Sequence, residues 1–187
     1  MLLRRPRRRS IARPGEKGNM GKLSGSILVA IGSNLPDAAG NSSLTVCRRA
    51  VLALGELPGL RVAAVSRWYR TAPVPASDQP DYVNGVVALD GTIAPEALLA
   101  ALQGLEARAG RRRSVANAAR ELDLDIIAIG DLVRDAPDPV LPHPRAHLRG
   151  FVLAPLADVA PNWCHPVLRR SVRDLLAALG EPPIRAI

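Results

Sequence analysis

The order of strand-like and helical segments limits the fold of this chain more than any other feature of its sequence. Between residues 27 and 127, short apolar or alternating segments typical of strands are interrupted twice by longer segments with helical periodicity. The predicted segments are strand 27–31, helix 42–57, strand 61–69, strand 82–89, helix 95–109 and strand 122–127. This β-α-β-β-α-β order predicts an α+β fold with a ferredoxin-like core, in which both helices pack on an antiparallel sheet. C-terminal helical additions are expected at 151–159 and 171–179.

The ends of the two predicted helices carry recognisable boundary residues. Asn41 or Ser42 can cap the first helix, which Pro58 and Gly59 bring to an end. Pro95 occupies the favoured first position of the second helix, and Gly110 follows its last turn.

The positive charge of the chain is concentrated at its N-terminus. Residues 1–22 hold eight of the 25 basic residues but one of the 17 acidic ones, which leaves the rest of the chain nearly neutral. We therefore expect residues 1–26 to form a disordered basic tail, and residues 27–187 to form a single domain with no global field that would attract nucleic acid. An Arg-rich start also resembles an organellar transit peptide, but a passive tail, or a translation start at Met20, is the preferred interpretation.

Cysteine content and hydropathy predict the compartment. Cys47 and Cys164 have neither a CxxC spacing nor a disulfide-rich context, so a reducing, cytoplasmic location is expected. No run of 18 apolar residues is present, so no membrane association is predicted. A monomer is expected.

The last predicted strand carries two acidic residues. In the segment Arg120-Glu121-Leu122-Asp123-Leu124-Asp125, the period of two places both Asp side chains on one face of a strand. Two neighbouring carboxylates on a sheet are unfavourable unless a cation or basic groups balance them, and Mg²⁺ with substrate phosphates would do so. The alternative is a strand edge with two solvated acids.

Several motifs occur together in an order that resembles a known enzyme family, 6-hydroxymethyl-7,8-dihydropterin pyrophosphokinase. The resemblance covers about residues 27–161 and rests on seven segments. These are Gly32-Ser33-Asn34-Leu35, residues 66–71, residues 78–84, residues 106–113, residues 122–126, Pro142-His143-Pro144-Arg145 and residues 149–153. The resemblance implies transfer of the pyrophosphoryl group of ATP to the hydroxymethyl group of the pterin, with release of AMP, in folate biosynthesis. It implies ATP and the pterin as the only substrates, and two Mg²⁺ ions.

The resemblance also implies roles for residues on the ATP side. Asp123 and Asp125 would hold the metal ions, and together with Arg111 and Arg113 they form the expected catalytic set. Guanidinium groups suit phosphate oxygens because their planar forks match them. The expected ATP-binding residues are Gln103, Glu106, Arg113, Arg120, His143 and Arg149.

A flat, aromatic pterin calls for ring faces and for amide groups that recognise its edge. By resemblance, the expected pterin-binding residues are Thr71, Val74, Tyr82, Asn84 and Phe151. For Tyr82 and Phe151, an ordinary place in the core is the alternative interpretation.

The sequence also departs from the family pattern. Many family members carry Trp-Gly-Pro-Arg before the acidic strand, whereas this chain has Asn117-Ala118-Ala119-Arg120. The aromatic platform that helps to close the loop is therefore missing. Pro75 stands where Gly is common, and its fixed φ would stiffen that loop.

Two other functions remain open from the sequence. A ferredoxin-like nucleic-acid-binding module with a basic arm would expose aromatic side chains on its central strands. A metal-dependent nucleotide-sugar transferase would also use an Asp-x-Asp motif, although that motif alone is weak.

Overall fold

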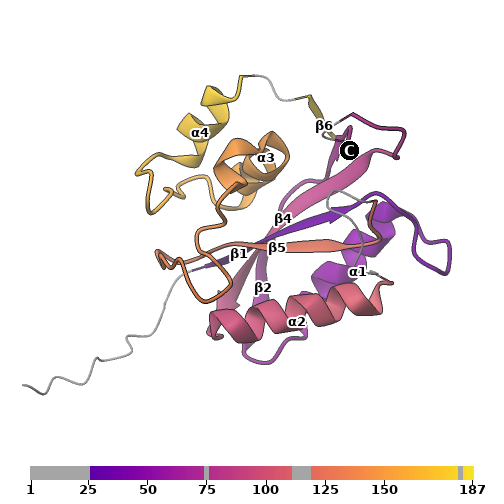
Figure 1. The fold of residues 1–187 in the computed structure, drawn as a ribbon, viewed down its shortest axis with the longest axis horizontal. Helices are drawn as coiled ribbons and strands as arrows, with labels where there is room; N and C mark the ends of the chain where they lie inside the picture. The colour runs from indigo at the N-terminus through magenta and orange to yellow at the C-terminus, as the bar shows by residue number, and fades with distance from the viewer. Residues whose placement is uncertain (1–25, 74–75, 111–118, 181–182) are drawn as a thin grey trace, which may run out of the picture.

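A six-stranded antiparallel sheet forms the centre of the described structure, and helices cover both of its faces (Figure 1). The computed structural model describes residues 26–73, 76–110, 119–180 and 183–187. Its strands are β1 (Ile27–Ser33), β2 (Leu60–Val65), β3 (Tyr69–Thr71), β4 (Tyr82–Gly91), β5 (Asp123–Ile129) and β6 (Ile184–Ala186). Its helices are α1 (Ser43–Gly55), α2 (Pro95–Arg108), the 3₁₀ helix η1 (Ala146–Leu148), α3 (Gly150–Val159) and α4 (Val172–Ala178). The predicted α+β class is confirmed.

The strand order is β5-β1-β4-β3-β6, and β2 also pairs with β4. Where one strand at 61–69 was predicted, the chain forms β2 and β3, separated by Ser66, Arg67 and Trp68. Ser66 explains the interruption, because its Oγ accepts the backbone N–H of Val86 at 2.9 Å. The two strands pair with successive stretches of β4, so together they occupy the single place that the prediction gave them.

One face of the sheet packs against α1 and α2. Alternate residues of β1, namely Ile27, Val29 and Ile31, are buried in this core together with side chains such as Leu54 of α1 and Leu102 of α2. The helix boundaries follow the predicted signals: Ser42 caps α1 by accepting from Thr45 N, and Pro95 opens α2.

The other face packs against α3, and α4 packs in turn against α3, on the opposite side of the sheet in Figure 1. Leu28 of β1 and Val86 of β4 meet Leu153 and Leu156 of α3 and Leu175 of α4 in a second apolar cluster. Because helices cover both faces, β4 is buried from Val83 to Leu89 without the alternation of a half-exposed strand. The C-terminal helical additions therefore complete a three-layer structure.

The C-terminus adds a strand that the sequence did not predict. Ile184–Ala186 forms β6 and pairs with β3 at the edge of the sheet. Of the predicted tail at residues 1–26, only Ser26 lies within the described residues. No helix in the described part of the chain is long and apolar enough to cross a membrane.

Candidate active site

One row of residues runs across the sheet toward its acidic edge strand. Gly32 of β1 lies opposite Asn84 of β4 on one side and opposite Asp123 of β5 on the other. Tyr69 of β3 lies opposite Asn84 and extends the row. The neighbours Ile31, Val83 and Leu124 are buried toward α1 and α2, so side chains in the row face the α3 side.

The two acids of β5 lie on that same face. Leu124 and Ile126, which alternate with Asp123 and Asp125, are buried in the core under α1 and α2. Both carboxylates are thereby directed to the α3 side, as a period of two requires.

Basic groups from two other segments surround the acids. Arg120 Nη1 lies 2.6 Å from Asp123 Oδ1. His143 Nε2 lies 3.8 Å from Asp125 Oδ2, and Arg149 Nη1 lies 3.9 Å from the same oxygen. The structure thus brings together five of the residues that the sequence assigned to the metal and ATP sites.

The donor set suits a hard cation that retains other ligands. Among the described residues, no group of three His, Cys, Asp or Glu side chains could hold a metal ion by itself. Asp123 and Asp125 supply carboxylate oxygens, and Mg²⁺ commonly binds one or two carboxylates while water and substrate phosphates complete its octahedron. These residues therefore fit Mg²⁺ delivered with a nucleotide.

His143 is held as a neutral donor. Its Nδ1 accepts the backbone N–H of Arg145 at 3.1 Å, which places the ring proton on Nε2, the atom that faces Asp125. Burial lowers the pKa of His143, and the nearby Arg149 and Arg145 lower it further, against the opposing effect of Asp125. A neutral imidazole can still donate a hydrogen bond to a phosphate oxygen from Nε2.

Asn34 joins three segments around the site. Its Oδ1 accepts the backbone N–H of Arg120 at 2.8 Å, and its own N–H donates to the Arg120 carbonyl at 3.1 Å. Its Nδ2 donates to Gln79 Oε1 at 3.1 Å and to the Pro80 carbonyl at 3.2 Å. One buried amide therefore links the segment before the acids to the segment that leads into Tyr82.

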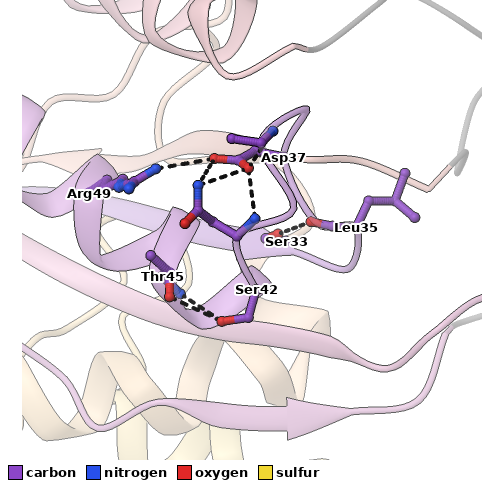
Figure 2. Close-up of polar contacts among 8 residues, drawn as sticks. Ser33, Leu35, Asp37, Ser42, Thr45 and Arg49 are labelled. Carbon is purple, nitrogen blue, oxygen red and sulfur yellow. Dashed lines mark hydrogen bonds and ion pairs between the residues drawn. The ribbon is translucent and has the colours of Figure 1, made fainter.

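The loop that carries Asn34 is internally braced, as Figure 2 shows. Asp37 accepts hydrogen bonds from the backbone N–H groups of Ala39 and Asn41 and forms an ion pair with Arg49 of α1 at 3.2 Å. Ser33 Oγ donates to the Leu35 carbonyl at 3.2 Å. These contacts fix the loop conformation that presents Asn34 and Leu35 to Arg120.

Three predicted pterin residues, Thr71, Tyr82 and Asn84, lie on neighbouring strands of the sheet that carries the acids, and Phe151 lies on α3. Asn84 Nδ2 donates to Thr71 Oγ1 at 2.8 Å, and both side chains are buried. Tyr82 is half-buried, and burial raises its pKa. The nearby charge of Arg120 lowers this pKa and that of Asp123 raises it, so Tyr82 borders the acidic end of the site. Phe151 of α3 lies under the guanidinium of Arg149, whose Cζ is 5.6 Å from the ring centroid.

The model of the 7,8-dihydro-6-hydroxymethylpterin-pyrophosphokinase (HPPK) family matches residues 28–161. The chain belongs to this family. It is similar to the 2-amino-4-hydroxy-6-hydroxymethyldihydropteridine pyrophosphokinase of Pseudomonas aeruginosa, at 42% identity over 152 residues, 81% of this chain and 90% of the relative. The enzyme of the same name from Synechocystis is 34% identical over 149 residues, 80% of this chain and 73% of the relative.

A solved structure of HPPK-DHPS from Plasmodium falciparum has the same fold, with a TM-score of 0.59 at 13% identity. It covers 86% of this chain, which spans 45% of the length of the solved chain. The HPPK fold is therefore found there within a longer protein.

Two residues that the HPPK resemblance placed near the nucleotide lie on α2. Glu106 is buried, and its Oε1 accepts the backbone N–H of Leu124 at 2.8 Å, between the two acids. Gln103 lies one turn earlier and is exposed. The Glu106 side chain thus supports the backbone of the acidic strand, a contact that the sequence did not reveal.

Several expectations concern residues outside the described part of the chain. Arg111, Arg113 and Val74 belong to this group, as do Pro75, Asn117 and Ala118 of the departures from the HPPK pattern.

Sequence reasoning assigned no role to Asn34 or Gly32, although both belong to the Gly32-Ser33-Asn34-Leu35 motif. A polar amide directly after a buried strand was the available signal.

Proposed function

We propose that this chain transfers the pyrophosphoryl group of ATP to the hydroxymethyl oxygen of 6-hydroxymethyl-7,8-dihydropterin, as a diphosphokinase of folate biosynthesis. A bond forms between that oxygen and the β-phosphorus, the bond from the β-phosphorus to the oxygen shared with the α-phosphate breaks, and the hydroxyl proton is released. The products are AMP and the pterin diphosphate. The observation that carries the proposal is the acid pair on one sheet face, flanked by Arg120, His143 and Arg149, beside Asn84 and two aromatic rings.

Phosphoryl transfer depends on positioning and charge compensation rather than on covalent help from the protein. Asp123 and Asp125 are proposed to hold two Mg²⁺ ions, which when bound would neutralise phosphate charge and favour ionisation of the attacking hydroxyl. Arg120 and Arg149 would hold phosphate oxygens with their guanidinium forks, and His143 would donate from Nε2.

Other contacts in the proposal come from the resemblance. Arg111 and Arg113 would compensate charge on the transferred group, Gln103 and Glu106 would lie near the nucleotide, and Val74 would contact the pterin through its backbone. Asn84 and Thr71 would recognise the edge of the pterin, and Tyr82 and Phe151 would face its ring.

We also propose that residues 27–187 act as one pyrophosphokinase domain, as a monomer in the cytoplasm. Cys47 and Cys164 are free thiols, which suits a reducing compartment. The nucleic-acid-binding alternative gains no support, because helices cover both faces of the sheet and Tyr69 is buried at 6% exposure.

The decisive experiment measures AMP and pterin diphosphate formed from ATP, the pterin alcohol and Mg²⁺. Asp123→Asn and Asp125→Asn should each lower the rate by about 10³-fold, because both remove a charged metal ligand. Asp131→Asn, an exposed acid just beyond the same strand, is the matched control and should stay within about twofold of the wild type. Thermal melting confirms folding. Undiminished AMP formation by Asp123→Asn would contradict the proposal.

A further inference from the structure

Asp158, in the last turn of α3, accepts four hydrogen bonds, three from Arg67 between β2 and β3 and one from Tyr69, the first residue of β3. Its Oδ2 accepts from Arg67 N at 3.2 Å, from Arg67 Nε at 3.2 Å and from the Tyr69 hydroxyl at 2.8 Å. Its Oδ1 accepts from Arg67 Nη2 at 2.8 Å. Hydrogen bonds from Arg67 and Tyr69 lower the pKa of Asp158 despite the opposing effect of burial, so the carboxylate is ionised at neutral pH.

These bonds fix the part of the sheet that carries the proposed pterin residues. Tyr69 lies directly opposite Asn84, and Thr71, two residues further along β3, accepts the hydrogen bond of Asn84. The Arg67 guanidinium also lies over the Tyr69 ring, 5.5 Å from its centroid. Asp158 therefore holds the start of β3 at a defined position relative to α3.

The opposite end of α3 carries Phe151, the proposed ring contact from this helix. Asp158 lies seven positions after Phe151, about 10 Å along the helix. The apolar contacts of Val152, Leu153 and Leu156 keep α3 packed against the sheet. Hydrophobic contact is non-directional, so it does not by itself fix the position of α3 along the sheet or its rotation about its own axis. Directional hydrogen bonds at Asp158 supply the missing restraint.

We propose that Asp158 is a positioning residue for the pterin. Through Tyr69 and Arg67 it sets the gap between α3, which carries Phe151, and the strands that carry Thr71, Asn84 and Tyr82. A flat bicyclic ring is held well only if that gap matches its thickness, so the restraint acts on pterin affinity and leaves the phosphate side unaffected. The inference rests on the proposed function.

The test measures the Kd of the pterin by its fluorescence, with a non-hydrolysable ATP analogue and Mg²⁺ present. Asp158→Ala should raise this Kd by about tenfold, and Tyr69→Phe by about threefold, because each releases part of the restraint. Asp158→Asn keeps an acceptor for the Tyr69 hydroxyl and should recover part of the affinity. The Kd of the analogue and the kcat at saturating pterin should stay within about twofold of the wild type.

Asp90→Ala is the matched control. It breaks the Arg61–Asp90 ion pair, 2.5 Å long, between β2 and β4 outside the ring site, and should leave the pterin Kd unchanged. A lower Tm without a change in pterin Kd in Asp158→Ala would overturn the proposal and leave Asp158 a purely structural residue. If Asp158→Ala does not fold, an unchanged pterin Kd in Tyr69→Phe would overturn it, because that variant removes only one hydroxyl.

Failure of this inference can be told apart from failure of the proposed function. A wild-type chain that binds the pterin and forms no AMP would overturn the function, while the affinity series would still decide the role of Asp158. A wild-type chain that does not bind the pterin would overturn both.

Discussion

At Gly32, β1 passes between Asn84 of β4 and Asp123 of β5, where the proposed pterin and metal sites meet. A Cβ at this position would lie 3.2 Å from Asn84 Oδ1 and 3.9 Å from Asp123 Cβ. The first distance is tighter than ordinary van der Waals contact, and Asn84 is already held by Thr71. Glycine therefore leaves the Asn84 amide in the position that its hydrogen bond defines.

Replacing Gly32 with Ala should weaken pterin binding by about three- to tenfold, because the added methyl displaces the Asn84 amide. Titration of the pterin in the presence of a non-hydrolysable ATP analogue checks this. Gly104→Ala in α2 is the control: its Cβ would meet only the flexible end of Arg108 at 3.5 Å, so it should stabilise the helix by about 0.5–1 kcal/mol and leave affinity unchanged. Equal affinity of Gly32→Ala and the wild type would show that Asn84 tolerates the methyl.

Among the elements, β5 receives support from a side chain of another element. In the described part of the chain it is an edge strand of the sheet, with β1 as its one neighbouring strand. Glu106 of α2 accepts the N–H of Leu124 at 2.8 Å in a buried position. The helix therefore supports the strand at the residue between the two acids.

Replacing Glu106 with Ala should lower the free energy of unfolding by about 1–3 kcal/mol, because a buried N–H loses its acceptor. Glu106→Gln keeps an acceptor oxygen and should lose less. Urea unfolding measures both, and hydrogen exchange of the Leu124 amide should accelerate in the Ala variant. Glu56→Ala, at the exposed end of α1, should change stability by less than about 0.5 kcal/mol. A Leu124 amide that stays fully protected in Glu106→Ala would refute this account of the edge.

In the whole molecule, the C-terminal third closes the second face of the sheet, and His165 is buried within it. His165 Nδ1 accepts the backbone N–H groups of Val167 at 3.3 Å and Leu168 at 3.2 Å, which requires that nitrogen to be unprotonated. The His147 ring contacts the His165 ring edge-on, with centroids 5.5 Å apart. Burial lowers the pKa of His165 below 6.5, and His147 lowers it further.

The lowered pKa gives stability a defined pH dependence. The unfolded chain takes up a proton on His165 at a higher pH than the folded chain does. The contribution of neutral His165 to the free energy of unfolding is therefore complete above about pH 6.5 and is lost as the pH falls through the folded pKa. Melting curves between pH 7.5 and pH 5 should show a larger drop in Tm for the wild type than for His165→Asn, which cannot titrate. Parallel curves for the two proteins would contradict the assignment.

Local patterns in the sequence determined much of the fold. The period of two placed Asp123 and Asp125 on one side of β5, and Ser42, Pro95 and Gly110 marked helix ends, because those signals act within a few residues. The same signals did not reveal the break at Ser66, whose side chain bonds to Val86, or the strand β6. Both depend on partners distant in the chain.

For the site, the sequence supplied the residue types and family resemblance supplied most roles, but the tertiary structure decided which groups meet. Asn34 reaches Arg120 across 86 positions and Gln79 across 45, and Asp158 reaches Tyr69 across 89. Periodicity fixes the face on which a side chain lies. The partner it meets there depends on how strands and helices pack, since packing alone brings distant segments within hydrogen-bonding distance.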